Sequence, residues 1–537
     1  MQASVSGWTA ASRAGVAALL IVAAACQSPP PRAQSTRPNI IVIMADDLGY
    51  SDIGAYGGEI DTPNLDELAA RGIRFNRFYN TARCWTARAS LLTGMYPHQV
   101  GLGGGILASD QPLGEPGPNQ GHLDENAPTI AEMLSDAGYA TYMAGKWHVG
   151  EQPQHWPRRR GFDRYFGLIS GASSYFEIIR DQPRIRQMAL DDDPWDPPAD
   201  GFYMTEAITD YAVRFIEDHA SARPDEPFFL YVAYTAPHWP LHALPEDIAK
   251  YDGRYARGWD AIRAERHARM IESGLIDERY RLSPRPPQVP PFAAAENSDD
   301  WVRRMQVYAA MVDRLDQGIG RIRNALQASD AYENTLILFL SDNGGSAENV
   351  SGRDLHDPEV PIGERGSYAA YRAPWANVSN TPFRRYKSWM YEGGIATPLI
   401  AHWPAGIADP GRTSSRIGHV IDIFATSVDL AGGASSAPGG SPSAPPVEGR
   451  SFAGVLAGQI GETHEALYWE HLGHRAMRRD DWKIVFAPAN DRWELYDLSN
   501  DPTELDDLAA ARTEILETMI AAWEAWARRV GAWSGGN

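Results

Sequence analysis

One stretch of the chain, Cys84 to Gly94, combines a thiol, an arginine and the pattern of a helix start. The other cysteine, Cys26, lies in a segment with the features of a leader, so no disulfide is expected within the mature chain. Ala89 to Leu92 is predicted to be the first turn of a helix, and the amino end of a helix favours an anion. Arg88 adds a planar cation that can bind an oxyanion. Cys84 and Arg88 are therefore candidate catalytic residues, with a buried structural cysteine as the alternative.

Acidic and amide side chains follow two apolar runs that are predicted to be strands buried on both faces. They are Asp46 and Asp47 after residues 39–45, and Asp342 and Asn343 after residues 336–340. Ligands of open α/β sheets bind beyond the carboxyl ends of the strands. An all-oxygen set suits Ca²⁺ or Mg²⁺, whereas the chain shows no Cys/His spacing typical of zinc. The sequence predicts a divalent-cation site at this edge, although either acidic pair alone is also typical of a helix cap or turn.

Two lysines and two histidines add candidates for charge stabilisation and proton transfer. Lys146 and His148 alternate in a predicted extended exit from the strand 140–144, which would place both side chains on one side. His238 lies between two prolines that restrict its backbone. Lys387 precedes a Glu-Gly-Gly sequence and a further apolar run. The alternatives are surface lysines for Lys146 and Lys387, a capping histidine for His148 and a loop histidine for His238.

Strand-like and helix-like segments alternate over about 400 residues, which predicts an α/β fold with a mostly parallel sheet covered by helices on both faces. The predicted strands span 39–45, 75–79, 140–144, 228–233 and 336–340, and the predicted helices span 62–68, 127–134 and 305–326. Residues 251–299 are broken by prolines and are predicted to be a loop-like rim or lid. After a Gly/Ser/Ala/Pro stretch at 431–446, short alternating segments and a final helix at 511–530 predict a small antiparallel subdomain.

The formal net charge of −20 opposes binding to nucleic acids and to anionic membrane surfaces. An anionic ligand could bind only where local cations outweigh this field. Arginine and lysine clusters are therefore more informative here than they would be in a basic protein.

The amino-terminal segment has the features of an export signal. Arg13 is followed by an uncharged apolar run, 14–25, that is shorter than the roughly 20 residues of a membrane span, and Ala23 to Cys26 resembles a lipoprotein cleavage box. Simple signal cleavage near Ala25 is the alternative to a lipid on Cys26. We predict an exported protein, either periplasmic or anchored to the outer membrane through that lipid. The expected segments are the signal at 1–26, a disordered tether at 27–37, a catalytic domain at 38–430, a linker at 431–450 and a carboxyl-terminal subdomain at 451–537.

In their order along the chain, these motifs resemble the type I sulfatases of the alkaline phosphatase superfamily. The matching segments are 46–49 (Asp-Asp-Leu-Gly), 84–94, 145–150 (Gly-Lys-Trp-His-Val-Gly), 237–238, 341–344, 387–394, 494–498 and 501–504. The resemblance extends from about Pro38 to the carboxyl terminus and implies an alkaline phosphatase-like fold. The segment 375–404 is most similar to bacterial arylsulfatases.

The resemblance also implies a mechanism and a set of roles. Cys84 would be converted to formylglycine, whose hydrate attacks sulfur and leaves a covalent sulfate ester on the enzyme. The implied ligands of Ca²⁺ are Asp46, Asp47, Asp342 and Asn343, together with residue 84. Arg88, Lys146 and Lys387 would stabilise the charge on the sulfuryl group. His238 would protonate the leaving alcohol, and His148 would remove a proton during release of sulfate. The implied partners are a sulfate ester, either a small molecule or a glycan, and a formylglycine-generating maturation enzyme.

The chain departs from the family motif at one position, because Thr86 stands where the family has Pro or Ala. An unconverted thiol would remove the usual route of sulfate release, so an inactive binder of sulfated ligands is one alternative function. A phosphoesterase or phosphonate hydrolase of the same superfamily is the other. The aromatics Trp156, Tyr175 and Phe176 could line an apolar subsite, although core packing also explains each of them.

Overall fold

The computed structural model describes residues 37–107, 111–112, 114–180, 186–350, 357–433 and 445–532. The predicted signal, nearly all of the predicted tether and the centre of the predicted linker lie outside the described residues. The described residues belong to one compact unit. The domain boundaries at residues 38, 431 and 451 stay predictions.

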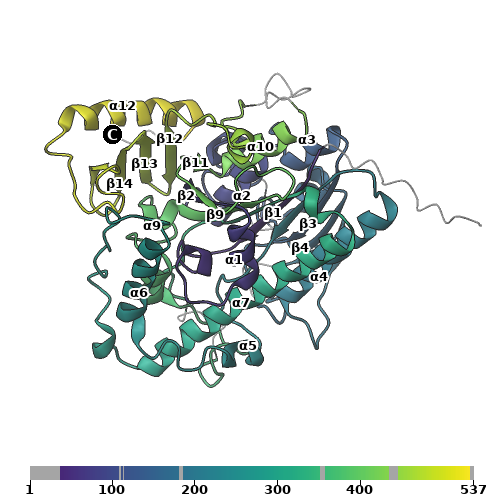
Figure 1. The fold of residues 1–537 in the computed structure, drawn as a ribbon, viewed down its shortest axis with the longest axis horizontal. Helices are drawn as coiled ribbons and strands as arrows, with labels where there is room; N and C mark the ends of the chain where they lie inside the picture. Colours follow the sequence, from purple (N-terminus) through teal and green to yellow (C-terminus); the bar gives the residue numbers. More distant parts are fainter. Residues whose placement is uncertain are drawn as a thin grey trace, which may run out of the picture. The chain divides into compact units, whose positions relative to one another are not determined.

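A sheet of eleven strands forms the centre of the described chain (Figure 1). Its strands are β1 (Asn39–Ala45), β2 (Ile73–Tyr79), β3 (Ala140–Gly145), β4 (Arg164–Leu168), β5 (Met188–Leu190), β6 (Asp193–Trp195), β7 (Phe228–Ala233), β8 (Thr335–Ser341), β9 (Ala396–His402), β10 (Arg412–Ser414) and β11 (Gly418–His419). The order is β10-β2-β9-β8-β1-β7-β3-β4-β5-β6, with β11 paired to β2. The central strands β8, β1, β7, β3 and β4 are parallel, whereas β9, β5 and β6 run antiparallel to their neighbours. The predicted α/β class with a mostly parallel sheet is confirmed.

The register aligns the carboxyl ends of the four central strands. Ala45 of β1 pairs with Ser341 of β8, and Met44 pairs with Ala233 of β7, which in turn pairs with Gly145 of β3. Whatever follows β1, β3, β7 and β8 therefore leaves the sheet at one edge.

Helices cover both faces of this sheet (Figure 1). The helices of this part of the chain are α1 (Pro63–Ala70), α2 (Cys84–Thr93), α3 (Ile130–Asp136), α4 (Met204–Ala222), α5 (Pro245–Ala249), α6 (Gly258–Glu272), α7 (Ser298–Ala328), α8 (Arg372–Ser379), α9 (Glu392–Ile395), α10 (Ile421–Leu430) and α11 (Ala453–Leu456). Alternate residues of β1 enter two different cores: Ile41 and Ile43 pack with α1 and α7, and Val42 and Met44 pack on the side of α2, α3 and α10. Burial on both faces explains the continuous apolar run of this strand.

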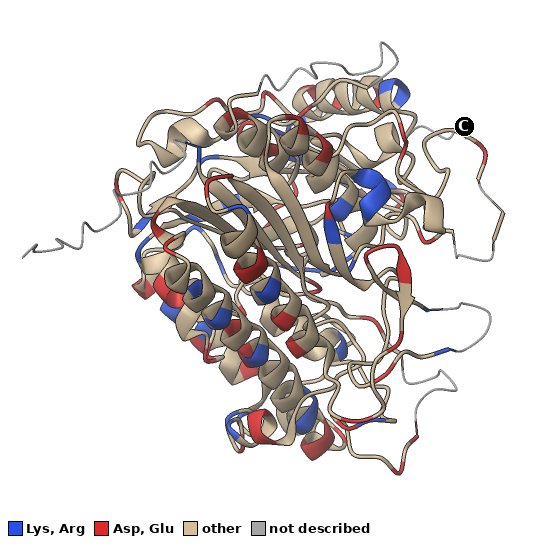
Figure 2. Ribbon diagram, turned by 90° about the vertical axis from the view of Figure 1, so that its right-hand side faces the viewer, with Lys and Arg blue, Asp and Glu red and all other residues tan. Residues whose placement is uncertain are grey.

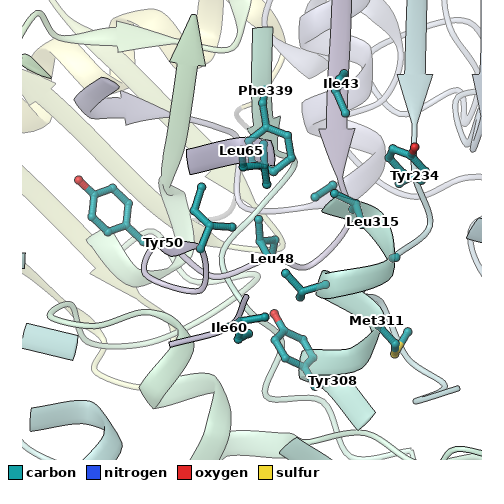
Figure 3. Close-up of a cluster of buried hydrophobic side chains, with 14 of the residues drawn as sticks. Ile43, Leu48, Tyr50, Ile60, Leu65, Tyr234, Tyr308, Met311, Leu315 and Phe339 are labelled. Atoms are coloured by element: carbon teal, nitrogen blue, oxygen red, sulfur yellow. The ribbon is translucent and has the colours of Figure 1, made fainter. Parts of the chain in front are cut away.

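The first of these cores lies between the sheet and the helices α1 and α7 (Figure 3). Ile43 and Phe339 reach it from β1 and β8, while Leu65 and Leu315 reach it from the two helices, and all four are at most 1% exposed. The amphipathic pattern predicted for residues 305–326 is confirmed and belongs to a helix of 31 residues. On their outer faces, α7 and α4 are joined by ion pairs of Arg321 with Glu206 and Asp210, and acidic and basic residues are interspersed over the helices (Figure 2).

The prediction that residues 251–299 are loop-like is wrong in part, because α6 occupies 15 of them. Its buried face includes Trp259, Ile262 and Met270, but also Arg263 and Arg266. Arg266 is fully buried and pairs with Asp52 at 2.7 Å and with Glu59 at 2.7 Å. Charged side chains on the inward face interrupt the apolar period, and so the amphipathic signal of the helix is weak in the sequence.

A second sheet, β12-β13-β14-β15, forms the antiparallel meander predicted after the linker. Its strands are β12 (Leu467–His471), β13 (His474–Arg479), β14 (Trp482–Ala487) and β15 (Arg492–Asp497), and the final helix α12 (Thr513–Val530) packs on it through Met519, Trp523 and Trp526. A buried ion-pair network joins this sheet to α9: Lys483 contacts both Glu392 and Glu504 at 2.7 Å. No helix within the described residues is long and apolar enough to cross a membrane.

Replacing the cation of this network tests how strongly the second sheet depends on it. Lys483→Met leaves two buried carboxylates without their partner, and we expect it to lower the free energy of unfolding by about 3–5 kcal/mol in urea denaturation. Arg279→Met, which breaks an exposed pair with Asp277, is the matched control and should cost at most about 1 kcal/mol. Equal effects of the two substitutions would show that the buried network does not stabilise the junction.

Candidate active site

Three carboxylates meet where β1 and β8 end. Asp46 and Asp47 follow β1, Asp342 follows β8, and each of the three can present an oxygen within 4.8 Å of the other two. The backbone N–H of Asp47 donates to Asp342 Oδ1 at 3.2 Å, and Asn343 Nδ2 donates to Asp47 Oδ1 at 2.6 Å. All four side chains are at most 1% exposed. The aligned strand ends therefore bring together the predicted metal-ligating residues.

The helix that carries the thiol begins earlier than predicted. Cys84 is the first residue of α2, so Ala89 to Leu92 forms its second half and not its first turn. Cys84 is 3% exposed, and its Sγ lies within 4.8 Å of atoms of Asp46 and His238. The thiol thus sits at the amino end of the helix, where free N–H groups favour negative charge.

Arg88 lies one turn further along α2 and is fully buried. Its guanidinium is 2.8 Å from Asp342 Oδ2 and 3.6 Å from Asp46 Oδ2, and it donates to the carbonyl of Lys146 at 3.0 Å. Burial acts to lower the pKa of Arg88, but the neighbouring Tyr231, Asp342 and Asp46 together hold it above its usual value. Arg88 therefore remains a cation inside the protein.

Lys146 follows the end of β3 and reaches one of these carboxylates, with its Nζ 2.5 Å from Asp46 Oδ2. The extended exit predicted for residues 146–148 is wrong, because His148 has a φ of 54° and β3 ends at Gly145 with a φ of 123°. His148 instead packs edge-on against Trp85, with ring centroids 5.7 Å apart. His148 therefore lies beside the start of α2, but this position does not result from the alternation of side chains along an extended segment that the sequence suggested.

His238 and Lys387 converge on Asp47. Lys387 Nζ lies 2.7 Å from Asp47 Oδ1, and His238 Nε2 lies 3.6 Å from Asp47 Oδ2. Both side chains are at least 95% buried. Asp47 therefore contacts a lysine that lies 340 positions further along the chain.

Two buried oxygens at this cluster have no hydrogen-bond partner among the described residues: Asp46 Oδ1 and Asn343 Oδ1. Buried polar atoms are normally satisfied, so an orphaned pair indicates a missing ligand. Burial and the neighbouring Asp46 raise the pKa of Asp342 to about 6, which shows the mutual repulsion of the carboxylates. Carboxylate and amide oxygens are the ligands that a hard divalent cation prefers, and the residues present fit such an ion.

The same burial affects the thiol and the imidazole. It raises the pKa of Cys84, although Lys146 and Lys387 act in the opposite direction, so the buried group favours the neutral thiol. Burial also lowers the pKa of His238 to about 3, which keeps this imidazole neutral. Neither group is charged in the cluster as it stands.

Glu348 is a site residue that the sequence did not single out. Its carboxylate accepts from Trp239 Nε1 at 2.7 Å and from Arg83 at 2.9 Å, and it lies 3.6 Å from Lys387. It follows β8 by seven residues, in a segment without a recognisable motif. Only the three-dimensional contacts reveal it.

Thr86 occupies the divergent position of the motif and is fully buried. Its hydroxyl lies 2.7 Å from that of Thr81 and 2.8 Å from the carbonyl of Arg83. It therefore helps to fix the start of α2.

Comparison with known proteins decides the family. The sequence model of the sulfatase family matches residues 38–434, and that of the N-sulphoglucosamine sulphohydrolase carboxyl-terminal region matches residues 384–524. The chain belongs to the sulfatase family. As a sulfatase it is a sulfuric ester hydrolase of the alkaline phosphatase-like fold, as the sequence predicted.

Several relatives resemble this sulfatase over most of their length. An arylsulfatase of Klebsiella aerogenes is 35% identical over 437 residues, covering 74% of this chain and 88% of its own. An uncharacterised sulfatase of Schizosaccharomyces pombe is 32% identical over 511 residues, covering 87% and 89%. Among solved structures, Ps i-CgsB in complex with k-i-k-neocarrahexaose superposes with a TM-score of 0.67 at 26% identity, covering 91% of this chain and 92% of that chain.

The orphaned oxygens predict that this sulfatase gains stability from a divalent cation. Adding Ca²⁺ to EDTA-treated protein should raise the thermal unfolding midpoint, because a ligand at a hundred times its Kd stabilises by about 2.7 kcal/mol. Asp46→Asn should abolish this gain. Asp313→Asn, which alters a buried carboxylate that pairs with Lys250, should retain it. A wild-type protein that is indifferent to both EDTA and Ca²⁺ would contradict the metal site.

Proposed function

We propose that this sulfatase hydrolyses sulfate esters of small molecules or glycans with formylglycine at position 84 and one Ca²⁺ ion. The observation that carries the proposal is the convergence of Asp46, Asp342, His238 and Lys387 around residue 84. Ca²⁺ would be held by Asp46, Asp47, Asp342 and Asn343, together with residue 84, and would polarise the sulfate. Formylglycine, as its hydrate, would supply an oxygen nucleophile that the neutral, buried thiol does not provide.

The chain's own cations would hold the sulfuryl group. Arg88, Lys146 and Lys387 are already in place, because each is anchored by a buried carboxylate at 2.5–2.8 Å. Preorganised cations in a water-poor site stabilise developing charge strongly, since they need no reorganisation during the reaction. Their role would be to bind the oxygens of the sulfate and to stabilise the charge that develops on them.

Proton transfer would be divided between the two histidines. His238 lies at the side of the cluster where Lys387 and Glu348 also lie, and its Nε2 faces Asp47, so it is placed to protonate the leaving alcohol. Burial favours the neutral imidazole, whereas the adjacent Asp47 favours its protonated form. His148, beside the start of α2, would take up a proton during release of sulfate.

The remaining proposals concern substrate, partner and location. The Klebsiella relative is named an arylsulfatase, and Ps i-CgsB was solved with an oligosaccharide, which supports aryl sulfates and sulfated glycans as the two substrate classes. We also propose that a formylglycine-generating enzyme modifies Cys84. The leader sequence supports export to the periplasm, with attachment to the outer membrane if Cys26 is lipidated.

Mass spectrometry of the peptide that contains residue 84 should reveal an aldehyde in protein isolated from its natural host, and such protein should hydrolyse 4-nitrophenyl sulfate. Cys84→Ala should lower kcat by about a thousandfold or more, because removal of a nucleophile abolishes the covalent route. A thiol at position 84 together with undiminished turnover would contradict the role of formylglycine. Faster hydrolysis of 4-nitrophenyl phosphate by the same preparation would favour a phosphoesterase instead.

The role of His238 predicts a dependence on the leaving group. His238→Asn should slow hydrolysis of an alkyl sulfate by about 10²–10⁴-fold, the usual contribution of a general acid. It should slow hydrolysis of 4-nitrophenyl sulfate much less, because nitrophenolate leaves without needing a proton. Equal losses for both substrates would assign His238 a role other than protonation of the leaving group.

A further inference from the structure

Glu348 lies where three segments that carry site residues come together. Its Oε1 accepts a hydrogen bond at 2.9 Å from Arg83, the residue at the start of α2. Its Oε2 accepts at 2.7 Å from the indole N–H of Trp239, the neighbour of His238, and lies 3.6 Å from Lys387 Nζ. Both oxygens of this carboxylate are engaged, and they join the start of α2, the segment after β7 and the loop that carries Lys387.

The cations around Glu348 fix the position of its carboxylate. Arg83 also donates to Ser388 Oγ at 2.9 Å, so its guanidinium is held at two points. Burial acts to raise the pKa of Glu348, but the neighbouring Lys387 and Arg83 hold it below its usual value, and the group stays ionised. Lys387 is bound more closely by Asp47, at 2.7 Å against 3.6 Å for Glu348. The position of Lys387 therefore depends chiefly on Asp47.

Trp239 holds the imidazole of His238 in two ways. The two rings are in contact, with centroids 4.4 Å apart, and the carbonyl oxygen of Trp239 lies 2.5 Å from His238 Nδ1. Because a carbonyl can only accept, Nδ1 carries a proton, and Nε2 is the nitrogen that faces Asp47 at 3.6 Å. The indole in turn donates to Glu348 and packs against Tyr368, with ring centroids 5.9 Å apart. The orientation of the imidazole thus depends on the indole, and that of the indole on the carboxylate.

We propose that Glu348 is a positioning residue for protonation of the leaving alcohol, and that it acts by holding Trp239 and, through it, the imidazole of His238. The inference rests on the proposed role of His238 as the acid. A general acid must lie within hydrogen-bond reach of the leaving oxygen, and a displacement of about 1 Å can cost about a hundredfold in rate. Loss of Glu348 should therefore matter most for substrates whose leaving group needs a proton.

Glu348→Gln tests this role, because the amide keeps the shape of the side chain but cannot accept at both positions. One of the two contacts, with Arg83 or with Trp239, must then be lost. We expect kcat for an alkyl sulfate to fall about 10- to 100-fold with KM little changed, and kcat for 4-nitrophenyl sulfate to fall much less. Trp239→Phe keeps an aromatic ring but removes the indole N–H. It should cause the same selective loss, and it provides the test if Glu348→Gln folds poorly.

A double substitution shows whether Glu348 acts through His238. In the His238→Asn background, Glu348→Gln should slow the alkyl sulfate little further, because substitutions of coupled residues are not additive. Glu132→Gln is the matched control, since the Glu132 side chain is 33% exposed against 32% for Glu348 and pairs with Arg160 at 3.1 Å. It makes the same change in net charge and should leave both rates unchanged.

The proposal would be overturned if Glu348→Gln slowed both substrates equally, or if it caused its full loss again in the His238→Asn background. Unchanged hydrolysis of the alkyl sulfate by Glu348→Gln or by Trp239→Phe would also overturn it. Failure of the proposed function gives a different pattern: the unaltered enzyme would hydrolyse neither sulfate, or His238→Asn itself would slow both substrates equally. The role of His238 would then be lost, and this inference with it.

Discussion

The buried pairing of three carboxylates with three cations is the interaction on which the site depends. Asp46, Asp47 and Asp342 face Arg88, Lys146 and Lys387 at the end of the central strands, and the exposed fraction of each is at most 5%. Burying a charge without a partner costs several kcal/mol per ion, so each member of the cluster holds its partner in place. The cluster is neutral by itself. A divalent cation between the carboxylates would therefore leave it positive, as a site for an anionic ester requires.

The architecture explains why residues so far apart in the sequence meet here. The parallel strands β8, β1, β7 and β3 end in register, and α2 directs its amino end to the same edge. Because the strands are buried on both faces, their positions are fixed by two cores, and the short segments after them have little freedom. The loop that carries Lys387 and Ser388 is joined to the start of α2 by Arg83, which contacts Ser388 and Glu348.

The sequence predicts the centre of this structure better than its rim. The strands β1 and β8 are evident because they are apolar runs followed by paired polar residues. The resemblance to sulfatases predicts the catalytic and metal-binding residues that the fold brings together. The helix α6 escapes prediction because Arg263 and Arg266 lie on its buried face, paired with groups distant in the chain. Glu348 belongs to no motif, and its place in the site follows from contacts that only the folded chain creates. The conformation of His148 is likewise not evident from the sequence, because only a minority of histidines adopt a positive φ even though the residue tolerates it better than most.

A crystal structure of the protein grown with Ca²⁺ is the most direct test of the central cluster. The account predicts anomalous density for one cation at about 2.3–2.6 Å from Asp46 Oδ1 and Asn343 Oδ1, the distances typical of calcium. Both oxygens lack a hydrogen bond among the described residues, so they have the most to gain from the ion. A cation bound elsewhere, with these two oxygens satisfied by water or by protein donors, would contradict the account.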